Sequence, residues 1–486
     1  MTGQRVVVIG GGLAGITAAI QLRDAGHEVT LLESRPRLGG AATSYPRAGL
    51  MIDNGQHVFL RCCTSYQELL SRLGMTASVT IQDRFDVTVL GPDGPARLRR
   101  SALPSPLHLA RALLSYRLLP LADRARVGRA ALAFRRADPA SLVLDREPLG
   151  DWLAARGQGE RARRRLWDLF VISALNIDGD QASTALAAKV IKTALLGRND
   201  AADIGLATVP LGRLHAEATA SLLARLGAQI RLGARATAVE RQSGGGFLVH
   251  LGRGEVGTAD EGPDPAGGQA LPADGVVLAV PADQAARLAG TAGTTGTAAW
   301  SELGYSPIVN VHVRYDRPVM NLPFVAAVDS PVQWVFDKTR QAGVPDGQYL
   351  AVSVSAADGL VEVPTAAIRE LFEPELARLF PAAAGATIRD FFVTRERRAT
   401  FRQGPGSGAL RPGAGTSVPG LVLAGAWTAT GWPDTMEGAV RSGHSAAREL
   451  TRALASRPAS GPAAAGSGGS SPRVGTERDS AWSGAS

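Results

Sequence analysis

Three glycines near the start of the sequence have the spacing of a phosphate-binding turn. Gly10, Gly12 and Gly15 stand between a β-branched apolar run, residues 5–9, and a segment with a helical pattern, residues 16–25. In such a turn the first glycine permits the tight bend, the second lets the backbone approach a pyrophosphate, and the third lets the helix pack closely on the sheet. The first N–H groups of the helix then face the phosphates. The pattern therefore predicts a dinucleotide site.

An acidic residue follows at the distance expected for a ribose contact. Residues 27–33 form a second apolar run with strand character, and this run ends on Glu33. A carboxylate in this position accepts hydrogen bonds from the adenosine ribose and disfavours a 2′-phosphate, so we expect FAD or NAD rather than NADP. Strand, glycine turn, helix, strand and acid in this order favour a nucleotide-binding βαβ unit over a glycine turn without a ligand.

The segment after the acid discriminates between the two cofactors. Residues 33–40, Glu-Ser-Arg-Pro-Arg-Leu-Gly-Gly, resemble the corresponding segment of the flavin amine oxidase and phytoene desaturase superfamily. The resemblance implies that Gly39 and Gly40 let the chain pass close to the FAD pyrophosphate. An arginine usually follows these glycines in the superfamily; Ala41 takes its place here, and Arg37 is a partial substitute. The segment indicates FAD.

A second superfamily signature lies near the C-terminus. Residues 423–427, Leu-Ala-Gly-Ala-Trp, and residues 436–443 resemble the segment that places a helix N-terminus beside the flavin end of FAD. The acid that usually follows the glycine is replaced by Ala426, so one flavin-side contact of the family is missing. Two signatures far apart in the sequence and in the expected order predict FAD as the cofactor.

Four shorter motifs narrow the resemblance. They are residues 52–59, 173–176, 333–337 and 431–437, and Asp-Asn-Gly-Gln-His at 53–57 is the most specific of them. Together they resemble the hydroxysqualene dehydroxylases, the squalene-forming flavoenzymes of bacterial hopanoid pathways. The similarity runs from residue 5 to about 452, apart from 252–274. It implies an enzyme that removes the hydroxyl group of a C30 isoprenoid, hydroxysqualene, by protonation, loss of water and delivery of a hydride from reduced FAD.

Such a reaction needs an acid near the hydroxyl group, an apolar tunnel and a rigidly held flavin. The resemblance implies Asp53, His57, Asp434 and Glu437 as candidate catalytic residues. Each has a structural alternative: Asp53 as the cap of the turn at 54–55, His57 as a partner of the backbone, Asp434 as a helix N-cap and Glu437 as a charge that stabilises a helix start.

The predicted FAD contacts combine the motifs above with their neighbours. They are Gly10, Gly12, Leu13, Ala14, Gly15, Glu33, Ser34, Arg37, Gly39, Gly40, Gly55, Gln56, His57, Val239, Gly425, Thr435 and Met436. Nothing in the sequence has the spacing of a metal site. The two cysteines, Cys62 and Cys63, are adjacent, which excludes a disulfide-stapled secreted scaffold and a zinc site and favours simple buried packing. Trp427 and Trp432 are expected to line the tunnel or to fill the core.

These residues require a fold that brings distant segments together. We expect an α/β protein in which a Rossmann-type FAD-binding domain, of the glutathione-reductase type, carries an α+β substrate domain. The FAD-binding domain should be discontinuous and comprise residues 1–75, 205–290 and 396–455, and the substrate domain residues 76–204 and 291–395. The Gly/Pro/Asp-rich segment 252–274 should form a surface loop and residues 456–486 a disordered tail.

Between residues 99 and 136, leucine clusters alternate with arginines and almost no acids. Residues 107–121, with Arg111, Arg117, Arg124, Arg126 and Arg129, fit an amphipathic patch on anionic lipid, from which an enzyme would collect a C30 isoprenoid. The alternative is a helical lid with a solvated arginine face. No run reaches the roughly 18 apolar residues of a membrane-spanning helix. We therefore expect a cytoplasmic protein, peripheral on the inner face of the cytoplasmic membrane.

Composition and motifs also limit the competing functions. Lysine and arginine number 52 against 44 acidic residues, a net charge of +8, but they are scattered without an aromatic-interleaved patch, which argues against nucleic acid. A carotenoid or phytoene desaturase or isomerase would share every FAD motif. An amine oxidase is disfavoured because the contexts of the three lysines do not suggest one beside the flavin, and a non-enzymatic prenyl carrier because both FAD signatures are intact. No pattern indicates the electron donor.

Overall fold

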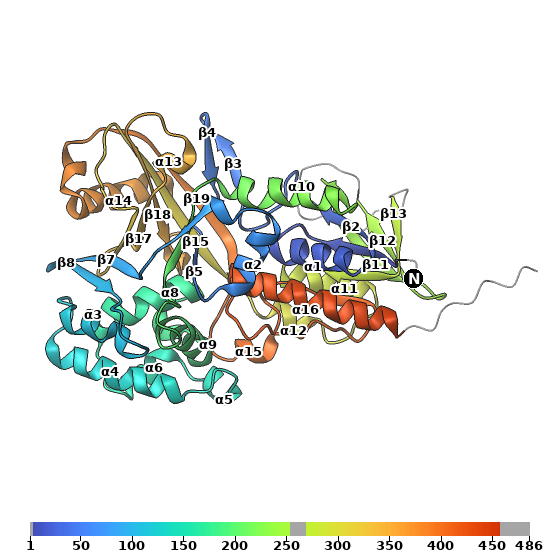
Figure 1. Cartoon of the computed structure of the whole chain (residues 1–486), viewed down its shortest axis with the longest axis horizontal. Helices are drawn as coiled ribbons and strands as arrows, with labels where there is room; N and C mark the ends of the chain where they lie inside the picture. The colour runs from blue at the N-terminus through green and yellow to red at the C-terminus, as the bar shows by residue number, and fades with distance from the viewer. Residues whose placement is uncertain (1–2, 253–268, 457–486) are drawn as a thin grey trace, which may run out of the picture.

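The computed structural model describes residues 3–252 and 269–456. Apart from Ser456, the expected disordered tail lies outside the described residues, and so does most of the expected loop at 252–274. Two large sheets and a helical region make up most of the described chain (Figure 1). No helix among the residues that the structure describes is long and apolar enough to cross a membrane.

A five-stranded parallel sheet carries the glycine motif. Its strands, in spatial order, are β10 (Gln229–Leu232), β2 (Glu28–Glu33), β1 (Arg5–Ile9), β14 (Gly275–Leu278) and β20 (Leu421–Leu423). Val6 and Val8 face one layer, formed by helices α1 (Leu13–Asp24) and α16 (Met436–Ala455), whereas Val7 and Ile9 face the other. Because side chains alternate along a strand, the β-branched run of β1 fills both layers. The predicted α/β fold with a Rossmann-type unit is confirmed.

The other face of this sheet is covered by a smaller antiparallel sheet and a helix. The strands are β11 (Ala236–Arg241), β12 (Phe247–Leu251) and β13 (Ala270–Ala273), and the helix is α11 (Ala282–Thr291). The expectation of a loose loop throughout 252–274 is wrong at its end. Residues 270–273 pair with β12, because this pairing buries Ala273 beside Phe247 and satisfies the backbone of both strands.

A seven-stranded sheet forms the second large unit. Its strands, in spatial order, are β19 (Ile388–Phe401), β15 (Tyr305–Tyr315), β18 (Gln348–Val354), β17 (Trp334–Asp337), β16 (Phe324–Ala327), β7 (Asp86–Gly91) and β8 (Gly94–Arg99). Helix α14 (Thr365–Leu379) packs on it through Ile368, Phe372 and Leu376.

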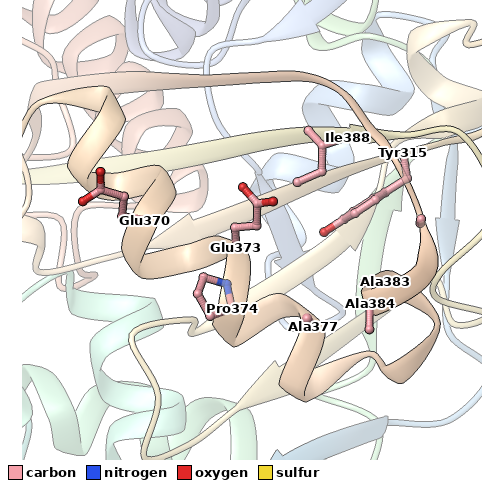
Figure 2. Close-up of a pocket in the computed structure, with 9 residues that line it drawn as sticks. Tyr315, Glu370, Glu373, Pro374, Ala377, Ala383, Ala384 and Ile388 are labelled. Carbon is pink, nitrogen blue, oxygen red and sulfur yellow. The ribbon is translucent and has the colours of Figure 1, made fainter.

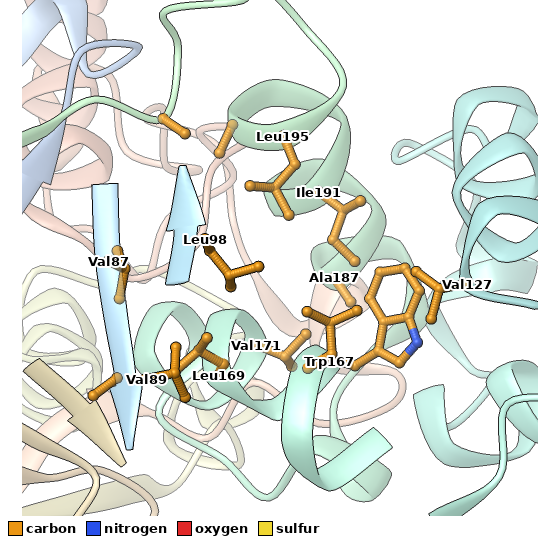
Figure 3. Close-up of a cluster of buried hydrophobic side chains, with 14 of the residues drawn as sticks. Val87, Val89, Leu98, Val127, Trp167, Leu169, Val171, Ala187, Ile191 and Leu195 are labelled. Atoms are coloured by element: carbon orange, nitrogen blue, oxygen red, sulfur yellow. The ribbon is translucent and has the colours of Figure 1, made fainter. Parts of the chain in front are cut away.

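The helical region lies below this sheet in Figure 1. It contains α3 (Ala110–Ser115), α4 (Leu121–Arg136), α5 (Leu142–Asp145), α6 (Leu149–Ala154), α7 (Glu160–Ala162), α8 (Asp168–Leu175) and α9 (Thr184–Val190). Figure 3 shows its core, where Trp167 lies beside Val127 of α4. Phe134 of α4 contacts Trp152 and Trp167, with ring centroids 4.2 Å and 5.4 Å apart. Helices and short helical turns occupy most of residues 152–196.

Short elements connect these units. A three-stranded sheet joins β5 (Val58–Leu60), β9 (Ile204–Ala207) and β6 (Val79–Ile81), and β3 (Ser44–Arg47) with β4 (Leu50–Asp53) forms a projecting hairpin (Figure 1). The remaining helices are α2 (Thr64–Arg72), α10 (Ala218–Arg225), α12 (Ala298–Ser301), α13 (Thr339–Ala342) and α15 (Ser407–Leu410).

Candidate functional site

The glycine turn after β1 has no room for a side chain at its first and third glycines. Gly10 has a φ of +109°, and a Cβ atom there would collide with the carbonyl oxygen of Ala279 after β14. A Cβ atom at Gly15 would collide with the carbonyl oxygen of Gly10. Gly12 is the N-cap of α1 and makes no side-chain cap, so the first N–H groups of this helix, from Leu13 onward, are left for a ligand.

The second glycine pair packs directly on the first. The N–H of Gly39 donates to the carbonyl oxygen of Gly11 at 2.9 Å. A Cβ atom at Gly40 would lie 2.8 Å from the Cα of Gly12. Ser34 and Arg37 are exposed at the start of this segment. The glycine turn at 10–15 and the segment 33–40, which are both predicted to bind the pyrophosphate, thus lie together.

Glu33 connects the strand end to the glycine turn. Its Oε2 accepts the N–H of Gly11 at 2.7 Å, while its Oε1 accepts the N–H of Arg35 at 2.8 Å and the hydroxyl of Ser34 at 3.3 Å. A carboxylate oxygen has two acceptor positions, so Oε2 retains one for a ribose hydroxyl. Glu33 therefore also holds the glycine turn in place.

The C-terminal signature lies at the same edge of the parallel sheet, after β20. Gly425 has a φ of +148°, and its N–H donates to the hydroxyl of Ser442 on α16 at 2.8 Å. Thr435 caps α16, since its Oγ1 accepts the N–H of Gly438 at 3.2 Å, and Met436 is the first residue of the helix. Thr435 therefore fills the capping role that was the structural alternative for Asp434.

Asp434 is a half-buried residue just before α16, and its carboxyl group faces the interior loops. Its Oδ2 accepts the N–H of Phe401 at 2.8 Å, and its own N–H donates to the side chain of Gln403 at 2.9 Å. Burial raises the pKa of Asp434 to about 6, although the Phe401 hydrogen bond and the charge of Arg411 oppose this shift. A carboxyl group with this pKa can both hold and release a proton near neutral pH.

Arg411 organises the loop around Asp434, a role that the sequence does not indicate. Its guanidinium group donates to the carbonyl oxygens of Ala426, Trp427, Thr428 and Trp432, at distances between 2.5 and 3.2 Å. Burial lowers the pKa of Arg411 to about 10. No local motif marks this role, because the partners are main-chain carbonyls that any residue can provide.

Glu437 has a different environment from Asp434. Its Oε2 accepts the N–H of Tyr66 at 2.8 Å, and its Oε1 accepts the N–H of Ser65 at 3.2 Å and the Nε of Arg441 at 2.7 Å. The two N–H groups belong to the first turn of α2, so Glu437 stabilises the start of that helix from a distant part of the chain.

Asp53 is buried at the end of β4 and accepts four hydrogen bonds. Its Oδ1 accepts the hydroxyl of Ser44 at 2.6 Å and the N–H of Leu211 at 3.0 Å. Its Oδ2 accepts the Nζ of Lys338 and the Nε2 of Gln341, both at 2.9 Å. Burial lowers the pKa of Lys338, while the Asp53 charge opposes the shift. Asp53 thus joins the β3–β4 hairpin to α13 instead of capping the turn at 54–55.

The rest of this motif lies against β15, and each of the two segments has one unpaired polar atom here. His57 donates through Nδ1 to the carbonyl oxygen of Gly55 at 3.1 Å, and burial lowers the pKa of His57. A Cβ atom at Gly55 would lie 3.1 Å from the Nδ2 of Asn310 on β15. The Oε1 of Gln56 and the Oδ1 of Asn310 are buried and have no hydrogen-bond partner among the described residues. Buried acceptors without a partner are rare in folded proteins, so these atoms fit a site that a ligand completes.

The two tryptophans have different surroundings. Trp427 is buried in the core beside the parallel sheet, and its Nε1 donates to the carbonyl oxygen of Val280 at 3.0 Å. The half-buried ring of Trp432 has two cations over it, with Lys189 Nζ 5.0 Å and Arg441 Cζ 4.8 Å from its centroid. Trp427 therefore fills the core, and Trp432 packs against cations.

Val239 is buried in β11, and its N–H donates to the hydroxyl of Thr291 at 2.9 Å. Its carbonyl oxygen lies 3.2 Å from the same hydroxyl, whose closer acceptor is the carbonyl oxygen of Leu288 at 2.7 Å, so the Val239 carbonyl keeps an acceptor position for a ligand. A pocket of about 450 Å³ lies between α14 and β19, where Tyr315 and Glu373 point toward each other (Figure 2). It contains none of the predicted site residues.

The glycine cradles, the open start of α1 and the unpaired acceptors fit the two ends of an FAD molecule. Glu33, Gly12 and Gly40 would hold the adenosine and pyrophosphate part. The residues around Gly55 and the start of α16 would face the flavin part. The donor set therefore agrees with the cofactor that the sequence predicts.

Comparison with known proteins agrees with this geometry. Residues 13–451 match the family of flavin-containing amine oxidoreductases. The hydroxysqualene dehydroxylase of Rhodopseudomonas palustris is 30% identical, over 91% of this chain and 97% of that protein. A zeta-carotene desaturase of Zea mays is 25% identical, over 90% of this chain and 82% of that protein. The structure of cyclohexylamine oxidase from Brevibacterium oxydans superposes with a TM-score of 0.68 at 20% identity, covering 93% of this chain and all of that one.

Proposed function

Because the chain belongs to the family of flavin-containing amine oxidoreductases, an FAD-dependent enzyme family, we propose that it reduces hydroxysqualene to squalene. The similarity to a hydroxysqualene dehydroxylase extends over nearly the whole of both chains and is greater than that to a zeta-carotene desaturase. The motifs at 53–57 and 431–437 support the same assignment.

The chemistry of the reaction requires a proton at the substrate oxygen. Hydroxide is a poor leaving group, so the C–O bond breaks as an acid protonates the oxygen and water departs. Reduced FAD, when bound, supplies the hydride that the carbon centre then receives. The protein must supply the acid and exclude other water from the cationic centre.

Asp434 is the acid that the surroundings favour, and this observation carries the proposal. It lies half-buried next to the start of α16, and desolvation of its carboxyl group raises its pKa to about 6. Asp53 and Glu437 have their carboxylates occupied by backbone N–H groups and by cations. His57 has a lowered pKa and is therefore neutral at physiological pH. We assign these three residues to positioning, with His57 and Asp53 holding the segment that would face the flavin.

The test is a single-turnover reaction. The purified holoenzyme is photoreduced under anaerobic conditions and mixed with hydroxysqualene, and the products are separated and identified. The expected result is squalene together with oxidised FAD in equal amounts. A desaturase would instead leave hydroxysqualene unchanged and, in its oxidised form with an electron acceptor, introduce double bonds into zeta-carotene or phytoene. That outcome would overturn the proposed function while leaving the FAD assignment intact.

A further inference from the structure

Exposed large apolar side chains are concentrated in one part of the fold. Among the described residues twelve large hydrophobic side chains are exposed, and seven of them lie between residues 103 and 143. Leu121 is 73% exposed and Val143 is 83% exposed. The seven are Leu103, Leu107, Leu114, Leu121, Leu132, Leu142 and Val143. We call this set the helical-region apolar face. Single exposed leucines are ordinary, but such a concentration indicates a surface that binds something.

Helix α4 has apolar residues on two opposite sides. Val127, Ala130 and Phe134 are buried against the core of the helical region shown in Figure 3. Residues 121, 125, 128 and 132, which are Leu, Ala, Gly and Leu, follow the spacing i, i+4, i+7 and i+11 and form one stripe on the other side. A helix that packs its inner side in this way needs no apolar outer stripe for folding. The outer stripe therefore serves another contact.

Arginines lie on both sides of the outer stripe. The stretch from residue 103 to 143 contains seven arginines and two acidic residues. By helical spacing, Arg135 lies on one flank of the α4 stripe, and Arg129 and Arg136 lie on the other. These three side chains are exposed, and the structure gives them no hydrogen bond or ion pair within the described residues. Cations beside an apolar stripe are the pattern of a helix that lies in a lipid interface.

One arginine of the expected membrane patch has a different role. Arg124 donates to the carbonyl oxygens of Leu119 and Leu114, at 2.8 and 2.5 Å, and so ends α3 and holds the turn before α4. Arg126 is paired with Asp123 at 2.9 Å. A change at Arg124 would disturb the fold, so it cannot report on lipid contact.

We propose that the helical-region apolar face binds reversibly to an anionic lipid surface, with α4 lying along the membrane plane and its outer stripe inserted between headgroups. The positive charge of this surface selects this occupant. A second copy of the chain joined through the same face would oppose arginines to arginines, whereas anionic headgroups neutralise them. The proposal stands on the surface alone and goes beyond the reaction proposed above, because lipid binding is measured without any substrate.

The experiment is flotation of the FAD-loaded protein with vesicles. One set of vesicles is phosphatidylcholine alone, and the other is phosphatidylcholine mixed with phosphatidylglycerol. Salt is set at about 0.01 M and about 1 M, where the Debye length is about 30 Å and about 3 Å. We expect binding to the anionic vesicles at low salt, and much weaker binding to the neutral vesicles and at high salt.

Two pairs of variants locate the contact. Leu121→Glu with Leu132→Glu should weaken binding at least about 100-fold, because two leucines lose their apolar environment. Arg129→Glu with Arg136→Glu should weaken it at least about 20-fold at low salt and far less at high salt. The matched controls are Leu322→Glu with Leu371→Glu and Arg225→Glu with Arg241→Glu, which change exposed leucines and arginines outside this face. All variants should keep the FAD content and melting temperature of the original protein.

Each possible outcome decides the proposal. Equal loss of binding in the control pairs, or no binding of the original protein to anionic vesicles at low salt, would overturn it. A dimer of the original protein, seen by light scattering, would also overturn it if the protein does not bind vesicles and if Leu121→Glu with Leu132→Glu converts the dimer to monomers. The face would then join two copies of the chain. Failure of the dehydroxylation assay leaves these measurements unaffected.

Discussion

Lys338 Nζ lies 2.9 Å from Asp53 Oδ2, and both side chains are almost completely buried. The two residues are 285 positions apart in the sequence. Asp53 ends β4, in the hairpin that follows the FAD signature, and Lys338 precedes α13, beside the seven-stranded sheet. The pair therefore fixes the position of the 53–57 motif relative to the sheet that would form the substrate region.

Removal of one partner of this pair should be costly. Lys338→Met leaves the Asp53 carboxylate buried without its cation, and we expect a loss of about 3–5 kcal/mol in the free energy of unfolding. Asp53→Asn should cost a similar amount, and the double variant should cost less than the sum, because neither charge is then left alone. Denaturant unfolding of the four proteins measures this coupling. Additive losses would show that the pair does not act as a unit.

Asp434→Asn should bind FAD normally and accept photoreduction, yet convert hydroxysqualene at least about 100-fold more slowly, because the side chain keeps its shape but loses its acidic proton. In the original protein the acid is active in its protonated form. Its pKa is raised to about 6, so the rate should be high below this pH and fall as the pH rises through it.

The matched comparison for Asp434 is His57→Ala. If His57→Ala loses the turnover and Asp434→Asn keeps both the rate and the pH dependence, the acid is His57, and the assignment of Asp434 is wrong.

Gly40→Ala should lower the affinity for FAD strongly. The added Cβ would lie 2.8 Å from the Cα of Gly12, so the two glycine segments must separate. Gly49→Ala is the control, because Gly49 also has a positive φ but has nothing within 4 Å of its added Cβ. Both variants suffer backbone strain, and only Gly40→Ala disturbs the cradle. The ratio of flavin absorbance to protein absorbance measures the difference. Equal flavin content in the two variants would contradict the pyrophosphate assignment.

Asp168 should make the free energy of unfolding decrease as the pH rises. Burial, helped by the charges of Asp178 and Asp180, raises the pKa of Asp168 to about 7. The pKa of an aspartate in the unfolded chain is near 4. When the pKa is higher in the folded state, the carboxyl group destabilises the folded protein increasingly as the pH rises from the unfolded-state pKa to the folded-state pKa. Asp168→Asn should thus stabilise the protein on the order of 2 kcal/mol more at pH 8 than at pH 4.

Thermal unfolding at several pH values tests this prediction. Asp151→Asn, which changes an exposed carboxylate on α6, is the control and should show no such trend. A stabilisation by Asp168→Asn that is equal at both ends of the pH range would show that the carboxyl group titrates normally.

The sequence predicts features whose parts are close together in the chain. Gly10, Gly12 and Gly15 follow one strand, and Glu33 ends the next, so one βαβ unit places all four. The start of α16 was expected from the same kind of local pattern. The contacts of Asp53 with Lys338 and of Glu437 with Tyr66 were not, since these partners lie hundreds of residues away and only the tertiary fold brings them together.

Other features that the sequence does not predict have different physical causes. Arg411 binds main-chain carbonyls, which every residue has, so no residue type marks its partners. The Gly/Pro/Asp-rich composition of residues 252–274 predicts a loop throughout, but pairing with β12 outweighs this local preference in β13. Tertiary pairing decides the structure of such short segments.

The order of strands in the parallel sheet has a consequence for protein synthesis. β14 has β1 on one side and β20 on the other, and α16 packs on α1, where Gly443 lies against Ala14 and Thr17. Until residues 421–455 have left the ribosome, one edge of β14 is unpaired and the apolar side of α1 is uncovered. A nascent chain therefore carries its cofactor cradle in an incomplete state for most of translation, and a stalled or prematurely ended chain would present an edge strand open to aggregation and to chaperones.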